Sequence, residues 1–93
     1  MIRNTSKTAY SSIYSSLPDK RRIVFGAIVE LQECTDYQIS QFLQWAINTV
    51  TPRRGELEKQ GLIESKRIIF NLNNRPAHLW QLTDKAKEQL YNY

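Results

Sequence analysis

Two helix signals between Thr35 and Gly61 leave room for only a tight turn between them. Thr35 followed three residues later by Gln38 is the pattern of a capping box, so a helix is expected to begin at Asp36. Gly61 is expected to end a second helix as a left-handed cap. The segment Gln44-Trp45-Ala46 lies between the two helices. This order predicts a helix-turn-helix.

Two further helices are expected before Thr35. Residues 8–17 carry apolar side chains at i, i+3, i+4 and i+7, and Pro18 breaks this helix and suits the first turn of the next. Residues 19–33 predict a core helix. Its apolar stripe consists of Ile23, Val24, Ala27, Ile28 and Leu31.

The two helices of the central motif are each expected to bury one side. In the first, the buried residues are Ile39, Phe42 and Leu43. The second helix is expected to start near Asn48 or Thr49, with Pro52 in its first turn. At about 100° per residue, Val50 and Leu57 share its buried side, and Arg53 and Arg54 fall on the flanks. The opposite face carries Asn48, Thr49, Pro52, Gly55, Glu56 and Lys59.

A β-hairpin and a last helix are expected after Gly61. Residues 63–71 and 77–82 predict two strands around a polar turn. Thr83 caps a helix that carries Ala86 and Leu90. Residues 1–93 are therefore expected to form one domain of the α+β class, mainly α. The architecture is a winged helix-turn-helix with a two- to three-stranded β wing and flanking N- and C-terminal helices.

Basic residues gather in two parts of the chain, whose net charge is +4. Five of the 13 Lys and Arg residues lie at or before Arg22, none lies from Ile23 to Ala46, and six lie from Arg53 to Arg75. Charge separated in this way is typical of a protein with one side that faces a nucleic-acid duplex. Uneven scatter in a small sample is the alternative.

The sequence carries no signal for an enzyme, a metal site or a cofactor. His78 is the only histidine and Cys34 the only cysteine, and there is no Gly-rich phosphate loop or acid cluster. No apolar run is long enough to span a bilayer, and the start MIRNTSK lacks the apolar core of a secretory signal. We therefore expect a cytoplasmic protein that is not an enzyme and binds no membrane or small-molecule ligand.

The second helix offers several groups to a duplex. Polar side chains near its N-terminus can read base edges, and the positive end of the helix favours phosphate. Arginines on its flanks can reach phosphate, although pairing with Glu56 and Glu58 is the alternative. A glycine on the exposed face allows the backbone to approach closely. The helix candidates are Asn48, Thr49, Thr51, Arg53, Arg54, Gly55 and Lys59.

The hairpin offers basic and amide side chains, and Lys66, Arg67 and Arg75 are expected to flank its tip. Such a wing can lie along the backbone or enter the minor groove, where arginine is favoured. For the asparagines, a role in forming the turn is an equal alternative. The wing candidates are Lys66, Arg67, Asn73, Asn74 and Arg75. The predicted function is binding of double-stranded DNA, with helix 48–60 in the major groove and wing 64–82 on the backbone or minor groove.

Three segments resemble the small winged-helix proteins of bacteriophages and prophages, which are distantly similar to the MarR-type regulators. They are the opening TSKTAY, the stretch NTVTPRRGELEKQGLI and the wing NNRPAHLW followed by LT, and they cover most of residues 5–83. The resemblance implies a DNA-binding protein of the host cell cytoplasm that regulates transcription or assists phage DNA transactions.

Two departures from the MarR pattern matter. MarR-like recognition helices usually carry an aliphatic residue where Arg54 stands, so the stem of Arg54 is expected in the core. MarR-like proteins also dimerise through long terminal helices, whereas the termini here are short. A homodimer through the terminal helices is therefore one of the alternatives for the oligomeric state.

Winged helices also serve as protein-docking domains, for example in an anti-repressor or an inhibitor of a host enzyme. This interaction module is the alternative function. Duplex affinity that depends on salt separates the two, because only phosphate contacts release counterions from DNA.

Overall fold

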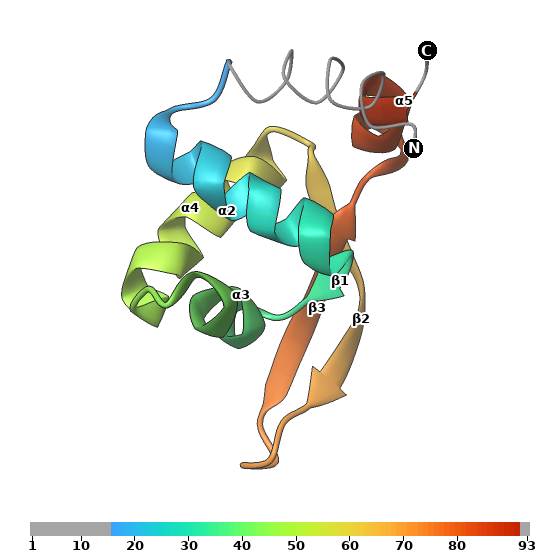
Figure 1. Cartoon of the computed structure of the whole chain (residues 1–93). Helices are drawn as coiled ribbons and strands as arrows, with labels where there is room; N and C mark the ends of the chain where they lie inside the picture. Colours follow the sequence, from blue (N-terminus) through green and yellow to red (C-terminus); the bar gives the residue numbers. More distant parts are fainter. Residues whose placement is uncertain (1–15, 92–93) are drawn as a thin grey trace.

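The computed structural model describes residues 16–91, so the helix expected at 8–17 lies outside the described residues except for its last two positions. Within the described part, four helices and three strands follow one another along the chain (Figure 1). In order, they are α2 (Asp19–Leu31), β1 (Glu33–Cys34), α3 (Asp36–Leu43), α4 (Ile47–Lys59), β2 (Ile63–Phe70), β3 (Pro76–Leu82) and α5 (Asp84–Tyr91).

The strands form one antiparallel sheet in the order β1-β3-β2. The hairpin is in register from Ile63 opposite Leu82 to Phe70 opposite Pro76, with an irregularity after Ser65. Because β1 covers only the base of β3, the outer half of the hairpin has two strands. It extends as a wing beyond α2, α3 and α4 (Figure 1). The fold is the predicted winged helix-turn-helix, mainly α.

The central motif is fixed by local hydrogen bonds. Thr35 Oγ1 accepts from the Gln38 backbone N–H at 3.1 Å, and Gln38 Oε1 accepts from the Thr35 N–H at 2.9 Å, which confirms the capping box. After α3, Gln44 takes the left-handed conformation with a φ of 59°. The Ser40 hydroxyl then donates to the Trp45 carbonyl at 2.6 Å and closes the turn.

The ends of α4 and α5 meet at Gly61 and Thr83. Gly61 has a φ of 77°, and the Leu62 N–H donates back to the Leu57 carbonyl at 3.1 Å, so α4 ends in the predicted glycine cap. Thr83 accepts from the Ala86 N–H at 3.1 Å and donates its hydroxyl to the Gly61 carbonyl at 2.8 Å. One threonine therefore caps α5 and ties it to the end of α4.

The core lies between α2, α3, α4 and the base of the sheet. Two residues that were predicted to be in the core are exposed, so these predictions are wrong: Ile23 is 39% exposed and Phe42 is 51% exposed. In α2 the buried residues centre between Val24 and Phe25, which turns Ile23 outward. In α3 the buried side is shifted toward Ser40, which lies on the other side of Ile39 from Phe42, so Phe42 turns outward. The large side chains exposed by less than 2% are Phe25, Ile28, Ile39, Leu57, Ile63, Leu90, Val24, Val50 and Cys34.

Cys34 is a core residue in β1. Burial, with smaller effects from Asp36 and Glu33, raises the pKa of its thiol to about 12. The thiol is therefore neutral at physiological pH, without the thiolate that redox or metal chemistry requires. None of the helices in residues 16–91 is both long and apolar enough to cross a membrane.

Candidate nucleic-acid interface

Helix α4 leaves one narrow stripe uncovered. The helix begins at Ile47, one or two residues before the expected start, and it buries Val50 and Leu57 as predicted. On the opposite side lie Asn48, Pro52, Gly55 and Lys59, spaced by four, three and four residues along the chain, which places them in one row. A Cβ atom added at Gly55 would meet no atom within 4 Å. The stripe is therefore flat in its middle, with an amide at one end and one cation at the other.

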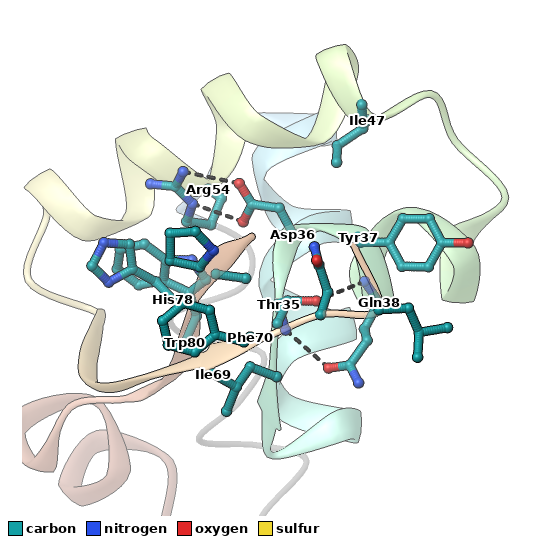
Figure 2. A pocket seen from close by; sticks show the side chains of 14 residues that line it. Thr35, Asp36, Tyr37, Gln38, Ile47, Arg54, Ile69, Phe70, His78 and Trp80 are labelled. Carbon is teal, nitrogen blue, oxygen red and sulfur yellow. Dashed lines mark hydrogen bonds and ion pairs between the residues drawn. The ribbon is translucent and has the colours of Figure 1, made fainter. Parts of the chain in front are cut away.

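An ion pair with α3 braces one flank of this stripe. Arg54 on α4 donates from Nε and Nη2 to the two carboxylate oxygens of Asp36, each at 2.9 Å (Figure 2). The Arg54 side chain is only 16% exposed and its guanidinium carbon lies 4.3 Å from the centre of a Trp80 ring. Glu58 and Thr51 complete the group, at 3.3 Å from Arg54 and 3.0 Å from Asp36. Helices α3 and α4 and strand β3 are thus joined at one guanidinium.

A second group of charges braces the other flank against α2. Glu56 accepts from Arg21 of α2 at 3.0 Å and from Arg53 at 2.9 Å. Arg21 also donates to Gln60 at 2.8 Å. Both sides of α4 are therefore held by arginine–carboxylate pairs, and the stripe between them is left open.

These contacts bear on the prediction that Arg53 and Arg54 reach phosphate. Pairing with Glu56 and Glu58, weighed as the alternative to phosphate contact, is present in the structure. The pairs with Asp36 and Arg21 were missed. They join residues 18 and 35 positions apart, so no local sequence pattern announces them.

The basic residues of β2 lie at the base of the wing, so the expectation that they flank its tip is wrong. Arg67 pairs in register with Leu79 and forms an ion pair with Glu33 of β1 at 2.8 Å. The hydrogen bond from Arg67 lowers the pKa of the Glu33 carboxyl. Lys66 lies 3.7 Å from Glu64. Of the three cations, only Arg75 is at the tip, because the strands extend to Phe70 before the chain turns.

The tip itself is a hydrogen-bonded turn. Asn71 Oδ1 accepts from the backbone N–H groups of Asn73 at 3.2 Å and Arg75 at 3.1 Å, and the Asn74 N–H donates to the Asn71 carbonyl at 2.9 Å. Asn74 has a φ of 63°, a conformation that asparagine tolerates. Within residues 16–91, no hydrogen bond or ion pair engages the Arg75 guanidinium. Asn71 and Asn74 are therefore explained by the structure of the turn, and the Arg75 guanidinium is free to contact a ligand.

A hollow of about 550 Å³ separates the wing from the start of α3 and α4. Its rim carries exposed apolar side chains: Tyr37 at 62%, Ile47 at 46%, Phe70 at 66% and Leu72. Tyr37 and Ile47 are labelled in Figure 2 on the side opposite the Arg54 group. Sequence reasoning missed these four residues, although the alternation of Ile68, Phe70 and Leu72 could have revealed the two that belong to the wing.

No protein-family model and no curated protein matches the chain. Among solved structures, it is similar to a mutant of ZitR from Lactococcus lactis, with a TM-score of 0.62, 26% identity, and coverage of 82% of this chain and 49% of that one. PadR from Bacillus subtilis in complex with operator DNA gives a TM-score of 0.59, 22% identity, and 76% and 46% coverage. A MarR mutant from E. coli complexed with operator DNA gives 0.62, 17% identity, and 99% and 65% coverage.

The chain thus spans about half the length of ZitR and PadR, and 65% of MarR. A MarR-family transcription regulator matches with a TM-score of 0.65 at 19% identity. The likeness shows that the chain shares the winged-helix fold of these proteins.

The Arg54 group leads to a stability prediction. Arg54→Ala removes three hydrogen bonds and the contact with Trp80, and leaves the Asp36 carboxylate without its cation. We expect the free energy of unfolding to fall by about 2 kcal/mol. Arg53→Ala, which removes one more exposed pair, should cost less than about 1 kcal/mol. Urea unfolding of both variants measures the difference; equal stability of the wild type and Arg54→Ala would contradict a bracing role.

Proposed function

We propose that the protein binds double-stranded DNA and regulates transcription, with α4 in the major groove and the wing on the adjacent backbone or minor groove. The observation that carries the proposal is the uncovered stripe from Asn48 to Lys59 on a helix braced along both flanks. A helix that enters the major groove needs such a free face and neighbours that fix its angle. The similar structures of PadR and MarR with operator DNA support the same use of this fold.

Within this proposal, the open stripe of α4 makes the closest contacts. Asn48 and Thr49, at the helix N-terminus, read base edges, because an amide or hydroxyl can pair with them in the major groove. Pro52 and Gly55 let the backbone approach, and Lys59 contacts phosphate.

The two flank arginines have different roles in the proposal. Arg54 uses all three guanidinium nitrogens within the protein, so it positions α4 and makes no base contact. Thr51 supports the same group through its bond to Asp36. Arg53 is 34% exposed and has a buried Nε without a hydrogen-bond partner in residues 16–91. Such a surface pair is weak, so Arg53 can exchange Glu56 for a phosphate.

The cations of the wing also have different roles in the proposal. Arg75 contacts the backbone or minor groove from the tip, flanked by Asn73 and Asn74. Arg67 holds the base of the wing to β1, and Lys66, 62% exposed, adds a long-range attraction for phosphate. A role in phage DNA transactions and a homodimer through the terminal helices stay predictions.

The apolar rim favours a second candidate function, docking of a protein partner. Tyr37, Phe70 and Leu72 are each more than half exposed, and exposed apolar groups that lie together often mark interaction sites. If this candidate is correct, added duplex DNA should not displace the protein partner, and the affinity for the partner should depend little on salt.

Duplex affinity should fall steeply with salt if the proposal is correct. About four phosphate contacts, from cations of α4 and the wing, give a log–log slope of roughly −4. Dissociation constants measured at several KCl concentrations with a mixed-sequence duplex provide the slope. A slope near zero, or no binding at low salt, would rule out this mode of DNA binding.

We expect Arg75 to contribute affinity and Asn48 to contribute sequence specificity. Arg75→Ala should weaken binding to all duplexes by a similar factor, because backbone contacts carry no sequence information. Asn48→Ala should reduce discrimination between a selected site and random DNA. Lys87→Ala, on α5 at the far end from the wing, removes the same charge as a control (Figure 1). If Arg75→Ala alters sequence preference more than Asn48→Ala, the two roles are reversed.

Gly55 tests whether α4 approaches the duplex closely. Because a Cβ there meets open space, Gly55→Ala should raise stability by about 0.5–1 kcal/mol. Gly55→Leu should also fold but lose duplex affinity, because the larger side chain separates the helix from the groove floor. Thermal unfolding and duplex affinity are measured for both variants. Normal DNA binding by Gly55→Leu would show that this face of α4 does not enter the groove.

A further inference from the structure

The wing ends in a leucine with no contact to cover it. Leu72 has a relative exposure of 105%, the highest among the large apolar side chains that the structure describes as exposed. A single exposed leucine is ordinary on a protein surface. This one occupies the tip of the hairpin, which extends beyond the helices (Figure 1). It is therefore among the first side chains to meet any surface that the wing approaches.

The turn holds Leu72 in place before any partner arrives. The preceding residue, Asn71, receives hydrogen bonds at its side chain from Asn73 and Arg75, and at its carbonyl from Asn74. The Asn71 N–H also donates to the Arg75 carbonyl at 3.0 Å. Four hydrogen bonds thus fix the backbone on both sides of Leu72. Little backbone conformational entropy therefore remains to be lost when the side chain is buried.

The charge around the tip selects the partner. No acidic residue occurs from Ser65 to Thr83, and Arg75 is three positions from Leu72 with its guanidinium free of partners in the described part of the chain. Proteins that bend DNA from the minor groove combine these two elements, an arginine for the narrow, electronegative groove and an apolar side chain placed between base pairs. An apolar tip without acids therefore fits a duplex.

We propose that Leu72 is a wedge that enters the minor groove, partly unstacks one base step and kinks the duplex, with Arg75 anchored beside it. The inference rests on the proposed function, because it presumes that the wing meets DNA. The wedge gives specificity for a base step to which Leu72 makes no hydrogen bond. The preferred step is pyrimidine–purine, because such steps unstack most easily. Site selection would then be shared between α4, through base edges, and the wing, through deformability.

The test measures bending and unstacking separately from binding. A duplex of roughly 30 base pairs, carrying the sequence that the wild-type protein selects from a random pool, is labelled at both ends for energy transfer. Wild-type protein should shorten the end-to-end distance and make thymines at one step reactive to permanganate. Leu72→Ser should bind with the same salt slope but lose both signals. Because burying leucine and unstacking a step offset each other, its affinity should change by less than about tenfold.

Two controls define the outcomes. Leu72→Met keeps an apolar wedge and should keep both signals, and thermal unfolding should be unchanged for both variants because the side chain is fully exposed. Binding by the wild type without bending or permanganate reactivity, or equal signals from Leu72→Ser, would overturn the wedge and leave DNA binding intact. Absence of duplex binding by the wild type would instead overturn the proposed function, and the wedge with it.

Discussion

The contact of Arg54 with Asp36 and Trp80 is the interaction on which the arrangement of this protein depends. Asp36 is the first residue of α3, Arg54 lies in the middle of α4, and Trp80 belongs to the central strand of the sheet. Arg54 and Asp36 are each less than one fifth exposed, so their attraction is screened less than that of a surface pair. The guanidinium serves both partners, with two nitrogens on the carboxylate and its central carbon over the indole. It therefore sets the angle of α4 against α3 and the wing together.

Pairing with arginine also bears on the proposed function, in which a helix with two glutamates must approach a polyanion. Glu56 and Glu58 on α4, and Asp36 at its side, would each repel phosphate. Glu56 accepts from Arg21 and Arg53, and Asp36 and Glu58 both accept from Arg54, so the two groups together carry no net charge. The potential that a duplex would meet is then set by cations without such partners, chiefly Lys59 and Arg75. A modest net charge of +4 is compatible with the proposed function because the acids on and beside α4 are paired with arginines.

The wing combines a firm base with an exposed end. At the base, β3 is paired on both sides, and the Arg67–Glu33 ion pair crosses from β2 to β1. Beyond β1 the hairpin has no third strand, and its apolar side chains, Phe70 and Leu72, are exposed. An exposed apolar edge is a liability for aggregation unless a partner uses it. The fixed turn at Asn71 gives this end a defined shape.

The amino-acid sequence by itself determined the elements whose signals are local. The capping box at Thr35, the glycine cap at Gly61 and the polar turn at the wing tip depend on residues at most a few positions apart, so their patterns predicted the helix-turn-helix and the hairpin. The tertiary structure decided which faces are covered and which charges are paired. Ile23 and Phe42 are exposed, and Arg54 and Arg21 are paired, because packing brought particular neighbours to them from elsewhere in the chain. Periodicity gives the direction of a side chain, but only the assembled fold determines what lies there.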